Sequence, residues 1–222
     1  MNKLTRVLGV FCLGLVLQGC HGQVNVPAVR IAAPMGMEPV PGRYAALVQS
    51  GGWKLDVKSS SYTCSAWSFD TNINASYRTA MQDALTQGLQ KVDFIEETLS
   101  PEEIQKRGYA AQVVLYQGSA KAQFGVSQNM FSGTAGSGVE LTSTLAVISH
   151  KGLAYQATVT GQGRGGRDVF SCATIGEAIG AAAAAAIQDM GSKSVLYIRD
   201  AIRSNQAAAA PEPAKIAVPL TQ

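Results

Sequence analysis

Few residues in this chain have the types and the spacing that chemistry requires. Its two histidines are His21, close to the start, and His150, in a turn between two expected strands. A nucleophilic triad needs a histidine with a carboxylate partner, and a zinc site needs three or four His or Cys ligands. The carboxylate pairs at 96–97 and 102–103 are typical of solvated surface at a strand end and a helix start. We therefore expect a protein that is not an enzyme and that uses no metal and no cofactor.

One glycine-rich segment has the spacing of a phosphate site. Residues 161–166 read Gly-Gln-Gly-Arg-Gly-Gly, but a dinucleotide site also needs a helix beginning at the last glycine and a parallel strand beyond it. Only one helix and a tail follow here, so we interpret the segment as a flexible loop. Arg164 and the nearby Arg167 then form a small basic loop that could meet an acidic or saccharide partner, with simple solvated charge as the alternative.

A second loop is a candidate for partner binding. Residues 129–138 are rich in Gly and Ser, and they include Met130 and Phe131 in an otherwise polar setting. Apolar side chains exposed on a loop often mark an interaction site. We expect these two residues to form an interaction tip or, as the alternative, a small collapsed cluster.

The N-terminal segment has the three-part layout of an export signal. Lys3 and Arg6 precede an uncharged apolar run over residues 7–17, and the run ends in Leu17-Gln18-Gly19-Cys20. This stretch resembles a bacterial lipobox. The resemblance implies cleavage after residue 19, a diacylglycerol thioether on Cys20, and acylation, for example by palmitate, of the new amino group. A plain secretory signal and a membrane-spanning helix are the alternatives, although a span needs about 20 apolar residues.

The resemblance also implies a location. In such lipoproteins an Asp directly after the lipidated cysteine favours the inner membrane, whereas this chain has His21. We therefore expect the lipid anchor in the outer membrane, with the protein facing the periplasm. Residues 20–42 contain four prolines among small residues, which indicates an extended tether that lifts the domain off the bilayer.

Charge and cysteine content narrow the partners. Loss of Lys3 and Arg6 with the signal leaves about +1 from 18 basic and 15 acidic residues, which argues against nucleic acid as the main partner. With Cys20 lipidated, Cys64 and Cys172 remain in a compartment that oxidises thiols, so we expect a disulfide. Closing a loop of about 108 residues would contribute about 4 to 5 kcal/mol. Two unpaired core thiols and a redox pair are the alternatives.

Periodicity predicts the elements of the domain. We expect strands at 43–49 and 53–57, which a hairpin turn could join, and a helix at 72–92. A short strand at 94–98, a short capped helix from Ser100, strand structure over 109–126, a hairpin of 139–149 with 153–160, and a final helix after Thr174 should follow. The fold class is α+β, in two layers, with a mainly antiparallel sheet and two long helices on one face. The domain covers residues 43–204, after the signal at 1–19 and the tether. An Ala- and Pro-rich disordered tail covers 205–222.

Together these features predict a lipid-anchored, non-enzymatic accessory or assembly subunit of an envelope machine, with envelope proteins as partners. In outline it looks like small sheet-and-helix lipoproteins that assist polysaccharide export, secretion or cell-wall synthases. The alternative is a periplasmic carrier that binds a lipid or glycan between helix and sheet. Tyr77, Tyr155 and Tyr197 could line its pocket, although a packed core explains these tyrosines equally well. A third possibility is a regulator of cell-wall enzymes.

Overall fold

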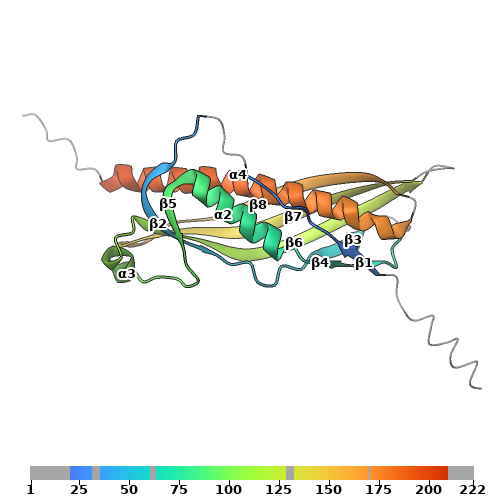
Figure 1. Cartoon of the computed structure of the whole chain (residues 1–222), viewed down its shortest axis with the longest axis horizontal. Coiled ribbons are helices and arrows are strands. Elements are labelled where there is room, and N and C mark those ends of the chain that lie inside the picture. Colours follow the sequence, from blue (N-terminus) through green and yellow to red (C-terminus); the bar gives the residue numbers. More distant parts are fainter. Residues whose placement is uncertain (1–20, 32–35, 61–63, 129–132, 170, 210–222) are drawn as a thin grey trace, which may run out of the picture.

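The computed structural model describes residues 21–31, 36–60, 64–128, 133–169 and 171–209. They form an elongated body in which two helices run along one face of a sheet (Figure 1). The elements, in chain order, are β1 (His21–Val24), β2 (Val40–Val48), β3 (Asp56–Ser59), β4 (Ser68–Thr71), α2 (Asn74–Gly88), β5 (Leu89–Phe94), α3 (Pro101–Lys106), β6 (Ala111–Gln128), β7 (Gly133–Ser149), β8 (Gly152–Val169), the 3-10 helix η1 (Cys172–Thr174) and α4 (Ile175–Ala209).

The main sheet is mixed, with the strand order β5-β2-β6-β7-β8 and with β3 also on β6. The two long pairings, β6 with β7 and β7 with β8, are antiparallel, whereas β2 and β3 pair parallel with β6. The predicted α+β class is confirmed, with α2 and α4 packed into one core on one face. The predicted hairpin of 43–49 with 53–57 is wrong, because 18-residue β6 pairs with β2 and β3 one after the other.

The first long helix is shorter than predicted. It ends at Gly88, and Leu89–Phe94, which the pattern divided between this helix and a later strand, forms β5 beside β2. A Cβ on Gly88 would lie 3.0 Å from Val195 on α4, so the small residue lets the two helices approach closely at that point. The short helix α3 begins as predicted, with a capping box between Ser100 and Glu103.

The predicted flexible loop at 161–166 is instead the middle of strand β8. Its alternate glycines Gly161, Gly163 and Gly165 face α4, where an added Cβ would overlap the carbonyl oxygens of Ala186, Ala182 and Ala178, respectively. Two strand residues advance about 6.8 Å and four helix residues advance about 6 Å, so both rows stay matched over three steps. The glycines therefore let a long alanine-rich helix lie directly on the strand backbone.

The segment predicted to be a tether is packed on the domain in its described part. Strand β1 pairs parallel with β4, and the side chains of Val24, Val26, Val29 and Ile31 are buried in the main core. The carbonyl oxygens of Gln23 and Asn25 face Gly176 and Gly180 on α4, where a Cβ would overlap them. The described part of this segment contains no helix, as its prolines predict, but its apolar side chains pack against the core. Residues 21–31 thus pack on the domain that was predicted to cover 43–204.

The C-terminal helix confirms the prediction and exceeds it. Helix α4 has 35 residues, about 52 Å at the usual rise, and continues to Ala209, past the predicted boundary at 204. Residues 210–222 of the predicted tail lie outside the described residues. Within the described ranges, no helix combines the length and the apolar character that crossing a membrane requires.

The predicted disulfide between Cys64 and Cys172 is present, with 5.7 Å between the Cα atoms, a usual separation for a bridge. It joins the turn before β4 to η1, which leads into α4. Since β1 pairs with β4 and packs on the start of α4, the bridge ties together the two elements that hold the N-terminal strand.

Candidate functional site

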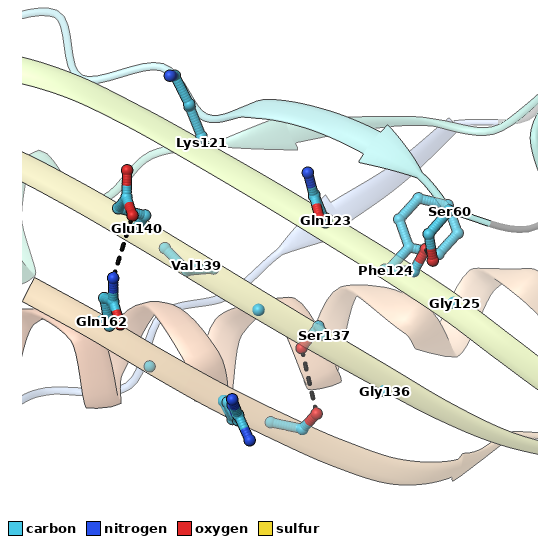
Figure 2. A pocket seen from close by; sticks show the side chains of 14 residues that line it. Ser60, Lys121, Gln123, Phe124, Gly125, Gly136, Ser137, Val139, Glu140 and Gln162 are labelled. Atoms are coloured by element: carbon cyan, nitrogen blue, oxygen red, sulfur yellow. Dashed lines mark hydrogen bonds between the residues drawn. The ribbon is translucent and has the colours of Figure 1, made fainter.

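Among the residues that the structure describes, small apolar clusters cover one end of the sheet face away from α4. There, α3 and its neighbours bury Ala45, Leu99 and Ile104, and a second small cluster buries Leu47, Val114 and Ala146. Beyond these clusters the same face of β6, β7 and β8 is open and forms a groove of about 810 Å³ (Figure 2). We call this the polar groove and define it by Ser60, Lys121, Gln123, Gly125, Gly136, Gly138, Glu140, Gln162 and Arg164.

The strand register arranges the polar groove in rows. Lys121, Glu140 and Gln162 lie side by side on β6, β7 and β8, and the next row is Gln123, Gly138 and Arg164. Figure 2 shows the labelled side chains of the first row on three neighbouring strands. Because side chains alternate between the faces of a strand, only every second residue reaches the groove. Residues as far apart in the sequence as 121 and 164 therefore contribute to one surface.

Hydrogen bonds fix one side of the groove. The Gln162 side-chain amide donates to Glu140 Oε2 at 3.2 Å. The Gln162 backbone N–H donates to the Asp189 carboxylate on α4 at 2.9 Å, and Lys193 donates to the Thr160 carbonyl at 3.0 Å. These α4 side chains also occupy two backbone groups on the outer edge of β8. Strand β8 is thus held in place beneath the groove.

Two cations of the groove are left without an ion pair. Lys121 and Arg164 both have exposed side chains, and in the described part of the chain neither lies within 4.0 Å of a carboxylate. Glu140 is the acidic side chain between them, and its carboxylate already accepts from Gln162. The groove therefore presents two cationic side chains that a ligand can contact.

Glycines leave the floor of the groove bare. A Cβ on Gly136 or Gly138 would meet no atom within 4 Å, so the space above these residues is open. At Gly125 the Ser60 hydroxyl lies across the strand, where it donates to the Phe124 carbonyl at 2.8 Å. The floor consequently presents flat peptide backbone, bordered by amide, carboxylate and cationic side chains.

The two arginines that the sequence placed in one basic loop lie on opposite faces of β8. Arg164 faces the groove, whereas Arg167 reaches toward α4, where its Nε lies 3.7 Å from Glu177 Oε2. The prediction of a common basic loop is wrong. Side chains alternate between the two faces of a strand, and these two residues are an odd number of positions, three, apart. Lys121, Gln123, Glu140 and Gln162 were missed, although the alternation of small apolar and polar residues in 120–125 could have identified one groove strand.

The other predicted site residues have different outcomes. Cys20, Met130 and Phe131 lie outside the described residues. His150 is exposed at the turn between β7 and β8. Among the described residues, His, Cys, Asp and Glu side chains form no group of three that could hold a metal ion.

His21 makes contacts that the sequence did not predict. Its Nδ1 lies 2.8 Å from the Ser68 hydroxyl and its Nε2 lies 2.7 Å from Asp70 Oδ2. The partners are reversed relative to a Ser-His-Asp triad, in which the carboxylate contacts Nδ1 and the nucleophile contacts Nε2. All three side chains lie on the paired strands β1 and β4, so they fasten the first described residue to the domain.

Among the described residues, the contact between β8 and α4 leaves no space for a ligand between helix and sheet at Gly161, Gly163 and Gly165. The glycines of β8 are in direct contact with the α4 backbone. Tyr77 is fully buried, its ring 4.9 Å from that of Trp53 and its hydroxyl 3.2 Å from Ser143 Oγ, and burial raises the pKa of Tyr77 to about 12. Tyr197 is 39% exposed on α4. The predicted tyrosine pocket is therefore wrong, because Tyr77 is a core residue and Tyr197 a surface one.

No protein-family model matches the chain, and no curated protein matches it. Solved structures that resemble it include XCC0632 from Xanthomonas campestris, of family model DUF330, at 13% identity and a TM-score of 0.41, over 84% of this chain and 99% of that one. A putative neuraminyllactose-binding hemagglutinin homolog from Helicobacter pylori has 9% identity and a TM-score of 0.42, over 82% and 100%. The hypothetical protein CT253 from Chlamydia trachomatis has 12% identity and a TM-score of 0.40, over 75% and 100%. Values this low transfer neither a ligand nor a partner to this chain.

Proposed function

We propose that this chain is a lipid-anchored, non-enzymatic lipoprotein of the outer membrane that serves as an accessory subunit of an envelope machine. The single observation that carries the proposal is that an open polar groove and the N-terminal strand share one end of the molecule. The Ser137 hydroxyl, next to the groove on β7, donates to the Ala178 carbonyl of α4 at 2.6 Å, and the Gln23 carbonyl faces Gly176 in the same region of α4.

The contacts of His21 determine how far the domain would lie from a lipid anchor on Cys20. If Cys20 carries the lipids, the first residue after it is already part of strand β1. The domain then sits against the bilayer instead of on a long tether, with its groove close to the membrane. A binding surface held at a fixed height suits a subunit that works beside other membrane-attached components, since fixing its position lowers the entropic cost of meeting them.

Crosslinking and pull-down of the native protein from its own membranes test the proposal. The matched control is Cys20→Ala, which removes the lipid-bearing sulfur and leaves every described residue unchanged. We expect a defined set of envelope proteins with the native protein, and loss of that set with Cys20→Ala. Recovery of the protein alone, or hydrolysis of an envelope polymer by the pure protein, would contradict the proposal.

A further inference from the structure

We propose that the polar groove binds an extended, acidic polysaccharide chain. This inference takes the groove from the proposed function and names its ligand class. The occupant must match three features of the groove: its side-chain chemistry, its bare floor and its charge.

The first feature is the set of hydrogen-bonding side chains. The large apolar residues of the lining, Phe124 and Val139, are almost fully buried in the core. Gln123 and Gln162 each offer an amide donor and an acceptor, and Glu140 offers acceptors. A sugar hydroxyl both donates and accepts, so these groups are complementary to it. On the same face, the flanking row on one side has Thr142 with Thr160. On the other side it has Gly125, Gly136 and Gly166, and the row after that has Thr134 with Asp168. No large apolar side chain lies in these rows, so an acyl chain or an apolar peptide would gain little from burial there.

The second feature is the open glycine floor. Gly136 and Gly138 leave the space above β7 empty, in the middle of the three strands. A polymer lying along this strand would meet flat backbone below and polar side chains from β6 and β8 on either side. A single small ligand would touch only one row, whereas successive units of a chain can repeat the same contacts about every 6.8 Å.

The third feature is charge. Lys121 and Arg164 are both exposed and lack an ion pair in the part of the chain that the structure describes. Their carboxylate neighbour Glu140 is partnered by Gln162. A guanidinium matches a carboxylate in two parallel hydrogen bonds, so Arg164 selects a chain that bears carboxylates. A uronic-acid polymer combines such carboxylates with hydroxyls.

Binding measurements with the purified full-length lipidated protein in detergent test this inference. The three probes are alginate as a polyuronate, dextran as a neutral glucan, and polyglutamate as a polyanion without sugar hydroxyls. We expect alginate to bind at least about tenfold more tightly than the other two, because only alginate satisfies both the charge and the hydroxyl requirement. Equal binding of polyglutamate would overturn the inference in favour of simple charge attraction, and absence of alginate binding would overturn it altogether.

Groove variants provide the matched comparison. Arg164→Gln should weaken alginate binding about tenfold, the loss expected for one charged hydrogen bond, and Gly138→Leu should abolish it by filling the floor without changing charge. Lys151→Gln, at the exposed turn between β7 and β8, removes one positive charge elsewhere and should leave the affinity unchanged. All three positions are on the surface, and equal unfolding midpoints would verify folding. An affinity that follows Lys151 as strongly as Arg164, or that ignores Gly138→Leu, would refute the site. Either result leaves the pull-down outcome standing, so the two proposals can fail separately.

Discussion

Substitution of Gly163 by alanine should destabilise the fold strongly, because the glycine row of β8 lies directly on α4. The added Cβ would lie 2.9 Å from the Ala185 Cβ, against a usual carbon separation of about 3.5 to 4.0 Å, and would overlap backbone atoms of Ala182. Helix α4 has little freedom to retreat, since its opposite side meets the Gln23 carbonyl at Gly176. Overpacking usually costs about 1 to 3 kcal/mol, and we expect about 3 because backbone is displaced. That corresponds to a fall in Tm of about 6 to 12 °C for a domain of this size.

The matched control is Gly136→Ala, on the neighbouring strand and the opposite face. Its Cβ would meet no atom within 4 Å, so the change should alter stability by no more than about 1 kcal/mol, if anything upward through a less flexible unfolded chain. Thermal unfolding followed by circular dichroism, with the disulfide intact in both variants, compares them. Equal Tm values for Gly163→Ala and Gly136→Ala would refute the close contact between helix and strand.

Changes at the disulfide, at Asp93 and at His21 should also have measurable effects. Replacing Cys64 and Cys172 together by serine should lower the free energy of unfolding by up to about 4 to 5 kcal/mol for a separation of 108 residues, measured in urea; no change would argue against the bridge. The hydrogen bond from Arg43 Nε to Asp93 Oδ2, at 2.7 Å, lowers the pKa of the Asp93 carboxyl in the folded protein. The ionised carboxylate therefore stabilises the fold above the unfolded-state pKa of about 3.9, and this stabilisation is lost as pH falls through the lower folded-state pKa. Asp93→Asn should accordingly be less stable than the wild type at pH 7, with the difference disappearing in strong acid; a pH-independent difference in urea midpoints would count against this. His21→Asp should move the protein to the inner membrane whereas His21→Asn should not, as judged by membrane fractionation, and identical fractionation of the two would reject the sorting hypothesis.

Patterns within a single segment of the sequence correctly predicted several elements. The capping box at Ser100, the turn around His150 and the apolar stripe of α4 each define their own element, and all three elements are present. The disulfide was also predictable, because the lipobox interpretation leaves only two cysteines and an oxidising compartment. In these cases the residue types within the segment itself are enough to predict its structure.

The misread segments depend on partners that are distant in the sequence. Alternating glycines in 161–165 have no side chain to show a strand pattern, and their role becomes visible only with the alanine row of α4 beside them. The Pro-rich segment 21–31 indicated extended backbone, but not that β4 and α4 would cover its valines. Gln123 and Gln162 share the groove only through the register of β6, β7 and β8.

Site-specific photo-crosslinking in native membranes tests most directly whether the polar groove is the partner-binding surface of a lipid-anchored protein. A photoreactive residue at Gln123 lies in the groove, and one at Lys151 lies at the exposed turn outside it. We predict a discrete crosslinked species, an envelope protein or a polysaccharide, from Gln123, and none from Lys151. Absence of any product from Gln123, with a discrete product from Lys151, would contradict the claim.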